Sequence, residues 1–487
     1  MGLLDPAVWT GRIGVSGWAP GEGPSITVRE AATGADLGML GGASPAQVAE
    51  AAERARQAQR AWAALPPARR SAVLRAAADV FEREAEQIVP WIVREAGSTW
   101  TKARSEILAA IAECREAAAL PTHPHGQVLP SNKERWSIAR RVPVGVVAVI
   151  SPFNYPLTLA IRSVAPALGL GNAVLLKPDP RTSVCGGVVL HRVFEAAGLP
   201  PDVLQVLPGG ADVGAAVVEA PQVRVVSFTG STAAGRRVGE AAARLLKRVH
   251  LELGGNNAIL VLPGADINRA AAAGAYGSFL HQGQVCQTAG RHLVHVSKYD
   301  DYVAALARIA ASLAVGDPFR ESVQIGPLID DNQAAAVRSI LAEARTAGAT
   351  AVAGGEVNGR FAQPTVLRDV TTAMRAWNEE IFGPVAPVMA YHNLDEAVDL
   401  INASEYGLSV AILGDVGTAL SLADRIHSGK VHINEQTIND EANVPFGGVG
   451  ASGNGARFGG ADANIEAFTE TQWVTMRSTI EEYVLRP

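Results

Sequence analysis

Val144-Gly-Val-Val-Ala-Val-Ile150 is an unbroken apolar run in a chain of 487 residues. Its length and its valine content predict a β-strand with both faces buried, which is typical of a parallel sheet covered by helices. The sequence changes character at this run. Helical patterns dominate the first hundred residues, whereas strand-like and helix-like segments alternate after it. The run therefore predicts an α/β domain built around residues 144–150.

Four further strand-like segments follow this run, and helical stretches separate them. The predicted strands are 173–176, 203–207, 223–228 and 250–253, and the predicted helices lie near 157–168, 183–197, 211–219 and 233–246. This alternation predicts a mostly parallel sheet with helices on both sides.

Before the apolar run, the clearest signal is the start of a helix. Ser44 can cap the first turn, Pro45 fits a first-turn position, and Gln47 can complete a capping box for a helix through residues 49–65. Two further amphipathic runs, at about 67–96 and about 102–118, predict two more helices.

Residues 257–440 repeat the alternating pattern, with helices predicted near 266–281, 299–314 and 331–347 among shorter strands. A chain of this length exceeds the size at which a single hydrophobic core divides. We therefore expect a second α/β domain.

Composition excludes several classes of function. The formal net charge of −6 and the pI near 6.0 give no electrostatic reason to expect nucleic-acid binding. Three cysteines, Cys114, Cys185 and Cys286, are too few and too far apart for a disulfide framework or a zinc cluster, and the first two are predicted to be packing residues. The N-terminus lacks the pattern of a signal peptide, and charges interrupt the alanine-rich segments. We expect a cytoplasmic protein that binds no metal and no membrane.

Two segments suggest chemistry. Phe-Leu-His-Gln-Gly-Gln-Val-Cys (279–286) ends an apolar helical run with a polar turn that presents Cys286, and Leu-Glu-Leu-Gly-Gly (251–255) places Glu252 at the end of a strand. A thiol nucleophile and a carboxylate that activates water are the groups needed to form and hydrolyse a thioester. From these residues alone, a buried structural thiol and a solvated edge charge stay open as alternatives.

Five further motifs occur with these two segments. They are Pro-Phe-Asn-Tyr-Pro (152–156), Leu-Leu-Lys-Pro (175–178), Phe-Thr-Gly-Ser-Thr (228–232), Glu-Glu-Ile-Phe-Gly-Pro (379–384) and Pro-Phe-Gly-Gly (445–448). In the order and spacing of all seven, the chain resembles the aldehyde dehydrogenases from about residue 20 to its end. Residues 177–182, 281–286 and 434–441 are most similar to the aromatic-aldehyde branch, the benzaldehyde and vanillin dehydrogenases.

The resemblance implies the α/β aldehyde dehydrogenase fold, with a Rossmann-like cofactor domain, an α/β catalytic domain and a small oligomerisation sheet. The expected limits are 1–119 and 142–253 for the cofactor domain, 254–440 for the catalytic domain, and 120–141 with 470–487 for the oligomerisation element, while 441–469 returns to the cofactor domain and the rim of the active site. A homodimer or a homotetramer is expected.

The resemblance also implies NAD(P)-dependent oxidation of an aromatic aldehyde, of the benzaldehyde, hydroxybenzaldehyde or vanillin type, to the carboxylic acid. Cys286 would attack the aldehyde carbon, and the side-chain amide of Asn154 and the backbone N–H of Cys286 would stabilise the alkoxide. Oxidation of this thiohemiacetal would leave a thioester, and Glu252 would deprotonate the water that hydrolyses it. Without the resemblance, Asn154 between two prolines is only a turn residue.

The expected cofactor site lacks the common G-x-G-x-x-G fingerprint. Instead, Gly230-Ser-Thr-Ala-Ala-Gly235 follows a predicted strand and opens a helix, which suits a pyrophosphate, although alone it reads as an ordinary turn. In the family, Ser231 contacts the pyrophosphate, Lys177 the adenosine ribose, and Glu380 with Phe382 the nicotinamide ribose. The remaining expected cofactor residues are Gly209 beside the adenine, Gly230, Gly235, Ile150, Pro152 and Phe153.

One departure from the family pattern affects the choice of cofactor. Many NAD-preferring relatives carry a glutamate three residues after the lysine, where this chain has Pro180. Loss of that carboxylate removes a repulsion against a 2′-phosphate, and Arg181 is close enough in sequence to help neutralise one. Use of both NADP and NAD is expected. That Pro180 only shapes the turn, with NAD preferred, stays open.

The resemblance places seven residues near the aldehyde tunnel: Tyr155, Leu159, Arg162, Val285, Gln287, Ile438 and Asp440. Tyr155 and Leu159 suit an aromatic ring. Arg162 either forms a structural ion pair or reaches the tunnel, where it would favour hydroxylated or acidic rings. An aliphatic aldehyde or semialdehyde dehydrogenase would share the catalytic residues. A catalytically silent relative is the remote alternative.

Overall fold

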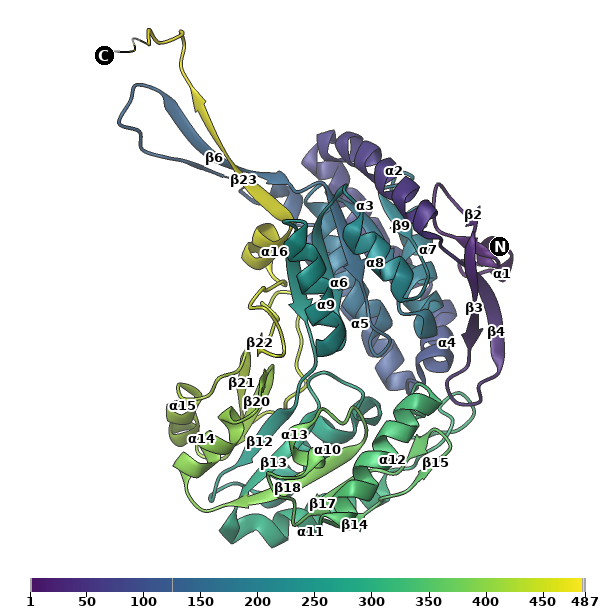
Figure 1. Ribbon diagram of the computed structural model, residues 1–487, viewed down its shortest axis with the longest axis vertical. Coiled ribbons are helices and arrows are strands. Elements are labelled where there is room, and N and C mark those ends of the chain that lie inside the picture. The colour runs from purple at the N-terminus through teal and green to yellow at the C-terminus, as the bar shows by residue number, and fades with distance from the viewer. Residues whose placement is uncertain (1, 125, 484, 486–487) are drawn as a thin grey trace.

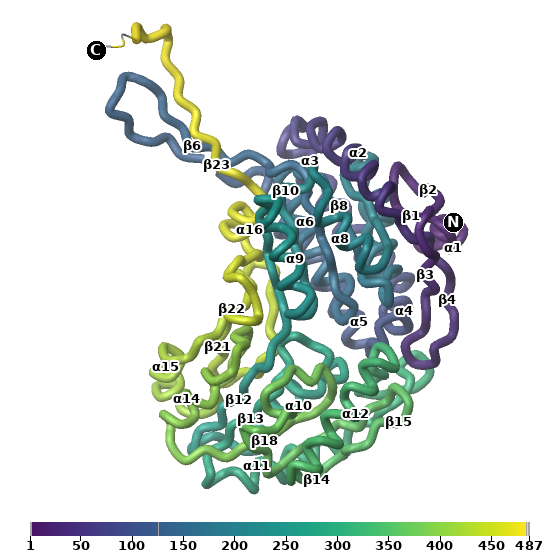
Figure 2. The backbone as a smooth tube through the Cα atoms, viewed as in Figure 1, coloured from purple at the N-terminus to yellow at the C-terminus, as the bar shows by residue number. Residues whose placement is uncertain are grey.

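The computed structural model describes residues 2–124, 126–483 and 485, and it shows two α/β bodies joined side by side with one protruding arm (Figure 1). The chain starts on the first body, runs out into the arm and back, crosses to the second body, and returns along the first body into the arm (Figure 2).

The predicted central strand is β7 (Val146–Ile150), and all five of its residues are buried. It lies in the middle of a parallel five-stranded sheet of order β11-β10-β7-β8-β9. The other strands of this sheet are β8 (Ala173–Lys177), β9 (Leu204–Val206), β10 (Val223–Thr229) and β11 (Arg248–Glu252), and β7 pairs directly with β8 and β10. Alternate residues of β7 belong to different cores, Val147 and Val149 to one and Val146 and Ala148 to the other. An apolar run without polar alternation is what this position requires.

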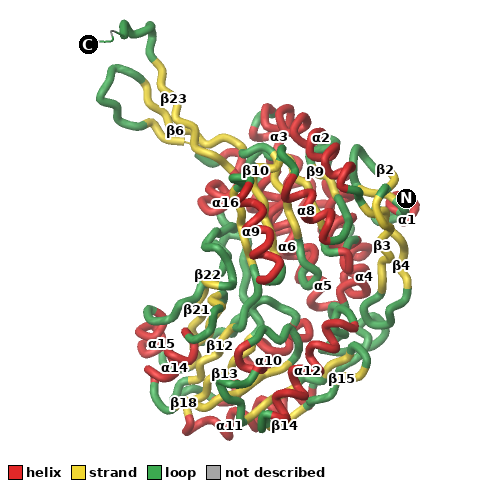
Figure 3. The backbone as a smooth tube through the Cα atoms, in the orientation of Figure 1, coloured by secondary structure: helices red, strands yellow, loops and turns green. Residues whose placement is uncertain are grey.

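Helices cover both faces of this sheet, as the alternating pattern predicted (Figure 3). The core around Val147 and Val149 is closed by α3 (Pro67–Arg83), α5 (Trp100–Ala117), α6 (Pro156–Gly169) and α7 (Val189–Ala196), and the opposite core by α2 (Pro45–Ala64), α8 (Ala211–Glu219) and α9 (Thr232–Arg244). Every residue of α6 is buried.

The capping box at Ser44 and Gln47 is formed as predicted, with both reciprocal hydrogen bonds present. The prediction of one helix over 67–96 was wrong, because the chain ends α3 at Arg83 and starts α4 (Ala85–Ala96) after Glu84, whose φ and ψ of −98° and 9° are not helical. The stretch near 183–197 also differs, since a π-helical turn, Val184–Val188, precedes α7.

The second body contains a seven-stranded sheet of order β14-β17-β18-β13-β12-β20-β21, in which only β14 runs antiparallel to its neighbour. The strands are β12 (Asn257–Val261), β13 (Ala289–His295), β14 (Thr350–Ala353), β17 (Thr365–Arg368), β18 (Val385–Tyr391), β20 (Ser409–Leu413) and β21 (Lys430–Ile433). The predicted helices are α10 (Ile267–Phe279), α11 (Tyr299–Ser312) and α12 (Asp331–Thr346). The expected domain boundary at 253/254 falls between β11 and β12, which belong to different sheets.

The arm is an antiparallel sheet of β5 (Gly126–Val128), β6 (Trp136–Pro143) and β23 (Thr469–Met476). These strands overlap the two segments expected to form an oligomerisation element, 120–141 and 470–487, although β6 ends at Pro143 and β23 begins at Thr469. Within those segments, residues 125, 484, 486 and 487 lie outside the described residues. Trp136 and Trp473 on the arm are 58% and 62% exposed. In the part of the chain that the structure describes, no helix combines the length and apolarity needed to cross a membrane.

Shorter elements complete the two bodies. They are α1 (Pro6–Trp9), β1 (Arg12–Ile13), β2 (Ala19–Pro20), β3 (Gly23–Arg29), β4 (Asp36–Gly42), β15 (Val357–Asn358), β16 (Phe361–Ala362), α13 (Arg375–Asn378), α14 (Leu394–Asn402), β19 (Tyr406–Gly407), α15 (Val416–Ala423), β22 (Val449–Gly450) and α16 (Ala461–Phe468).

Candidate active site

The order of the first sheet creates a crevice. Successive strands lead away from β7 in one direction through β8 and β9, and in the other through β10 and β11, so the connections diverge between β7 and β10. Ligands of open parallel sheets bind beyond the carboxyl ends of the strands at such a point. A cavity of about 540 Å³ lies there, and its lining includes Ile150, Pro152, Phe153, Lys177, Gly230, Ser231, Glu380 and Phe382 from the expected cofactor set.

Lys177 supplies the cation of this crevice. The residue is 8% exposed, and its ammonium forms no hydrogen bond or ion pair with a described residue. Burial lowers the pKa of Lys177. A buried ammonium without a partner that faces a cavity needs an acceptor from a ligand, such as ribose hydroxyls.

Glu380 also lines the crevice. Its carboxylate accepts a hydrogen bond from the Gly255 N–H at 2.9 Å, and burial raises its pKa to about 7. The next residue but one, Phe382, has a positive φ of 52° and packs edge-on against Phe153. A non-glycine residue in this conformation is strained, and such strain is found where a backbone is shaped around a ligand.

Of the expected small residues Ser231, Gly235 and Gly209, only Ser231 lines the crevice. Ser231 lines the crevice as the N-cap of α9, and its hydroxyl accepts a hydrogen bond from the Ala234 N–H. Gly235 and Gly209 do not line the crevice. A Cβ at Gly235 would lie 2.2 Å from Leu253, and one at Gly209 would lie 2.3 Å from Val213, so both positions permit close packing.

Two carboxylates occupy the guanidinium of Arg181, which was predicted to help neutralise a 2′-phosphate. Its guanidinium is bound by Asp179 and Asp330, each at 2.9 Å, and stacks 4.1 Å above the Phe153 ring. The two carboxylates raise the pKa of Arg181 and already compensate its charge. Arg181 therefore lines the crevice, but its charge is already paired and is not available to a phosphate.

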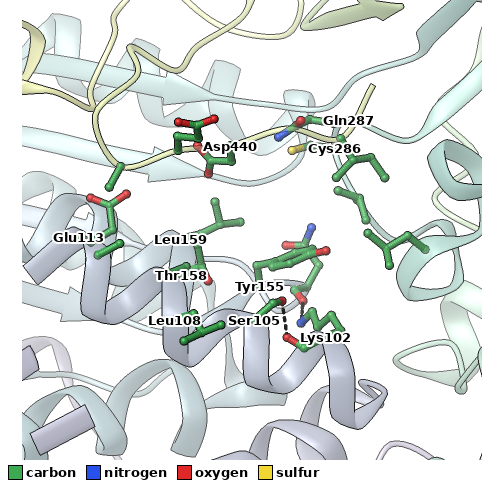
Figure 4. Close-up of a pocket in the computed structure, with 18 of the residues that line it drawn as sticks. Lys102, Ser105, Leu108, Glu113, Tyr155, Thr158, Leu159, Cys286, Gln287 and Asp440 are labelled. Atoms are coloured by element: carbon green, nitrogen blue, oxygen red, sulfur yellow. Dashed lines mark hydrogen bonds between the residues drawn. The ribbon is translucent and has the colours of Figure 1, made fainter. Parts of the chain in front are cut away.

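A second cavity, of about 920 Å³, meets the first at three residues that line both: Cys286, Asn154 and Leu159. α5, α6 and the loop 438–443 form much of its wall (Figure 4). Six of the seven expected substrate residues line this cavity: Tyr155, Leu159, Val285, Gln287, Ile438 and Asp440.

A strained turn presents Cys286. His281, Gln282 and Gly283 have φ values of 49°, 57° and 66°, three left-handed residues in succession. Packing holds this turn, since the Gln282 amide donates to the carbonyls of Gly97 and Pro327 at 2.9 Å. In the sequence, only the polar character of residues 282–284 indicated this turn. The left-handed conformation of His281 and Gln282 gave no signal, because glycine is the only residue that adopts it readily.

The Cys286 thiol is half-buried at the junction of the cavities. Its carbonyl accepts a hydrogen bond from the Asn257 amide at 2.8 Å, which fixes the backbone. Burial raises the pKa of the thiol to about 12, and Glu380 and Glu252 add to this, whereas Lys430 lowers it. The resting thiol is therefore protonated near neutral pH.

Asn154 is held from two sides. Its amide donates to the Gln284 carbonyl at 3.0 Å, two residues before the thiol, and its own carbonyl accepts a hydrogen bond from the Lys102 ammonium at 2.6 Å. Lys102 pairs with Glu106 at 2.5 Å, and both side chains are at most 2% exposed. Glu106 also accepts hydrogen bonds from two N–H groups in the first turn of α6, at 3.1 and 3.2 Å. One buried ion pair thus fixes the start of α6 and the turn that carries Asn154.

Glu252 is 3% exposed at the end of β11 and does not line either cavity. Burial raises its pKa well above the usual range, although Arg162, Arg457 and the Gly448 N–H lower it. Its charge acts on the thiol, as the pKa of Cys286 shows. The carboxyl group is therefore near enough to affect the nucleophile, while its own burial opposes its ionisation.

Arg162 does not line the cavity and is fully buried behind its wall. The guanidinium is hydrogen-bonded to Asp440, and its Nε lies 3.6 Å from the Glu113 carboxylate. Of the two alternatives for Arg162, the structural ion pair is the one observed. Its expected placement on the tunnel surface needs correction, because Asp440 and Glu113 lie between its charge and the cavity.

Comparison with known proteins agrees with this geometry. The model of the aldehyde dehydrogenase family matches residues 18–474. The chain belongs to the aldehyde dehydrogenase family. It is 57% identical to a vanillin dehydrogenase of an Amycolatopsis species over 99% of this chain and all of that one, and 46% identical to an NAD⁺ benzaldehyde dehydrogenase of Pseudomonas putida over 96% of each. The solved salicylaldehyde dehydrogenase of Pseudomonas putida G7, complexed with salicylaldehyde, matches with a TM-score of 0.93, 33% identity, and coverage of 97% and 99%.

Some residues of this aldehyde dehydrogenase site were absent from the sequence predictions. Lys102 and Glu106 have helical i, i+4 spacing, which indicates a pair but not burial or contact with Asn154. Glu113 lines the substrate-side cavity with a side chain 5% exposed. Nothing in its alanine-rich surroundings pointed to it.

Proposed function

We propose that this aldehyde dehydrogenase oxidises aromatic aldehydes, of the benzaldehyde, hydroxybenzaldehyde or vanillin type, to carboxylic acids with NAD or NADP. The observation that carries the proposal is the junction of the two cavities at Cys286 and Asn154. A thiol and an amide donor meet there between a crevice with a cation and a cavity walled by Tyr155 and Leu159. The similarity to vanillin, benzaldehyde and salicylaldehyde dehydrogenases supports the aromatic class.

In the proposed reaction, the Cys286 thiol first releases its proton to water in the adjoining cavity, and the thiolate then attacks the aldehyde carbon. The carbonyl oxygen then becomes an alkoxide, and the Asn154 amide and the Cys286 backbone N–H stabilise the charge. Because the carbonyl of Asn154 is bound by Lys102 and its amide by the Gln284 carbonyl, the donor is in place before substrate arrives. Such preorganisation lowers the cost of forming the charged intermediate.

The crevice has the features that a nicotinamide dinucleotide needs. We propose that Lys177 binds the adenosine ribose, Glu380 and Phe382 the nicotinamide ribose, and the N-terminus of α9 at Ser231 the pyrophosphate. When bound, the cofactor accepts the hydride that leaves the aldehyde carbon. Because Arg181 is bound by Asp179 and Asp330, the absence of a carboxylate at Pro180 is the main feature that favours acceptance of a 2′-phosphate.

We assign Glu252 as the base that removes a proton from water and allows hydrolysis of the thioester. The carboxyl group must first lose its own proton, which its raised pKa opposes near neutral pH. In the conformation seen, it faces Arg162 and Arg457 rather than a cavity. To act as the base, the Glu252 side chain must therefore rotate toward Cys286.

We further propose an oligomeric state and a cellular compartment for this protein. The edge strands β5 and β23 of the arm have open backbone groups, and the arm exposes Trp136 and Trp473. Unpaired edges with exposed aromatic residues suit contact with a second copy, so we propose a homodimer or homotetramer. Three free cysteines, with Cys114 and Cys185 buried, suit a reducing cytoplasm.

The test is a substrate panel followed by the absorbance of reduced cofactor. Benzaldehyde, 4-hydroxybenzaldehyde, vanillin and hexanal are each supplied with NAD and with NADP. We expect higher kcat/KM for the three aromatic aldehydes than for hexanal. A preference for hexanal would overturn the substrate class and leave the catalytic residues standing.

A further inference from the structure

Glu113 is a buried carboxyl group in the wall of the substrate-side cavity. It extends from α5 on the same side of the cavity as Asp440, toward the opposite end from Lys102 (Figure 4). Its side chain is 5% exposed and makes no hydrogen bond with any described residue; its closest charge is the Arg162 Nε at 3.6 Å. A buried polar group without a hydrogen bond is costly, so a partner inside the cavity is expected.

The charges around Glu113 do not provide that partner. Arg162 directs its hydrogen bonds to the Asp440 carboxylate and the Glu441 carbonyl. One guanidinium is therefore shared by two carboxyl groups, and the second, Glu113, has only the longer contact. Burial raises the pKa of Glu113 to about 8, and Asp440 opposes its ionisation. Near neutral pH the group carries a proton, and it can both donate and accept a hydrogen bond.

The remaining wall suits a ring. Tyr155, at the N-cap of α6, and Leu159 within it line the cavity together with Val285, Ile438 and Cys286. A benzene ring held between these side chains directs its aldehyde carbon to Cys286 and Asn154. A substituent on the ring then projects toward the polar end, where Glu113 lies.

We propose that Glu113 recognises a hydroxyl group on the aromatic ring of the substrate, at a position remote from the aldehyde. This rests on the proposed function and narrows it to hydroxylated benzaldehydes. The hydroxyl group gives Glu113 the hydrogen bond that the protein does not. A carboxylate on the ring is disfavoured, since Glu116, Asp440 and Glu441 line the same cavity and Arg162 does not. The two cations that do line it, Lys102 and Arg115, are already paired with Glu106 and Glu82.

The test compares kcat/KM for benzaldehyde and its 2-, 3- and 4-hydroxy derivatives. We expect the wild type to prefer a 3- or 4-hydroxy substrate over benzaldehyde. Glu113→Leu should reduce that preference about 10-fold, because a lost hydrogen bond in a buried site has an effect of this size. Glu113→Gln, which still donates and accepts, should keep most of it. Glu86→Leu, at an exposed glutamate on α4 outside the cavity, is the control for replacement of a glutamate by leucine away from the substrate.

A second measurement does not depend on the folding of Glu113→Leu. Benzyl alcohol and 4-hydroxybenzyl alcohol are compared as inhibitors of the wild type and of Glu113→Gln. If 4-hydroxybenzyl alcohol inhibits the wild type more tightly than benzyl alcohol does, the proposal is supported. Equal inhibition by both, or a Glu113→Leu variant that keeps the wild-type hydroxyl preference, overturns it while benzaldehyde oxidation stands. A wild type that oxidises no aromatic aldehyde overturns the proposed function together with this inference.

Discussion

The Lys102 ammonium donates a hydrogen bond to the backbone carbonyl of Asn154 at 2.6 Å. The same ammonium pairs with Glu106 and lies 4.1 Å above the Tyr155 ring. Lys102 thereby orients two neighbours with different tasks, the amide donor and an aromatic wall. It is a positioning residue for the proposed oxyanion site.

Replacing Lys102 with methionine should lower kcat about 10- to 100-fold, because a displaced Asn154 amide loses part of its stabilisation of the alkoxide. The dissociation constant for the cofactor should change little, since Lys102 does not line the crevice. Steady-state kinetics and cofactor titration measure both. Lys102→Met/Glu106→Gln removes the charge left unpaired and should recover stability but not kcat. Equal kcat in Lys102→Met and wild type would show that Asn154 needs no such support.

Cys286→Ala should abolish aldehyde oxidation while cofactor still binds. The thiol is the nucleophile in the proposed reaction, whereas Lys177 and Glu380 make up the crevice. Fluorescence titration with NAD and NADP, alongside the turnover assay, separates the two functions. The matched control is Cys114→Ala, on the buried face of α5 outside both cavities. Residual turnover by Cys286→Ala above the uncatalysed rate would contradict the assignment.

Glu252→Gln should form the acyl-enzyme and then stop. Glutamine cannot accept the proton of water, so the thioester persists and reduced cofactor appears as a single burst of about one equivalent per site. Stopped-flow absorbance and mass spectrometry of the intact protein would detect the burst and the added acyl mass. Turnover at the wild-type rate would remove Glu252 from the role of base.

The rate should rise with pH. The carboxylate of Glu252 and the thiolate of Cys286 are the reactive forms, and both groups have raised pKa values. Because burial raises the pKa of the Cys286 thiol to about 12, the thiolate fraction keeps growing as pH rises, and we expect kcat/KM to increase through about pH 9 without reaching a plateau. The pH profile of wild type tests this. A flat profile would indicate that bound substrate and cofactor already deprotonate both groups.

Asp330→Asn should shift cofactor preference toward NADP about 3- to 10-fold. The change removes one of the two carboxylates that hold Arg181, and it leaves the cap of α12, since asparagine also accepts the Gln333 N–H. The freed guanidinium can then approach a 2′-phosphate. The ratio of kcat/KM for the two cofactors is the measurement, and Asp331→Asn, whose partner is Arg360, is the control. An unchanged ratio in Asp330→Asn would exclude Arg181 from cofactor choice.

Local patterns were sufficient for most of the fold. The apolar run at 144–150 became β7, the capping signals at Ser44 and Gln47 became the start of α2, and the helix predicted at 211–219 is α8. Each depends on residues that are neighbours in the chain: period, propensity and caps. The break at Glu84 was missed, because residues on both sides of it continue the helical pattern.

The sequence by itself determined the family, the alternation of strands and helices in the first α/β domain, and the identity of Cys286, Asn154 and Glu252 as candidates, because motifs of a few residues hold that information. Only the tertiary structure decided what surrounds them. The Lys102 contact with Asn154 joins residues 52 apart, and the Arg162 bond to Asp440 joins residues 278 apart. Burial, unpaired charge and the pKa of a thiol depend on such neighbours in space, and no local pattern specifies which distant side chain will form the contact.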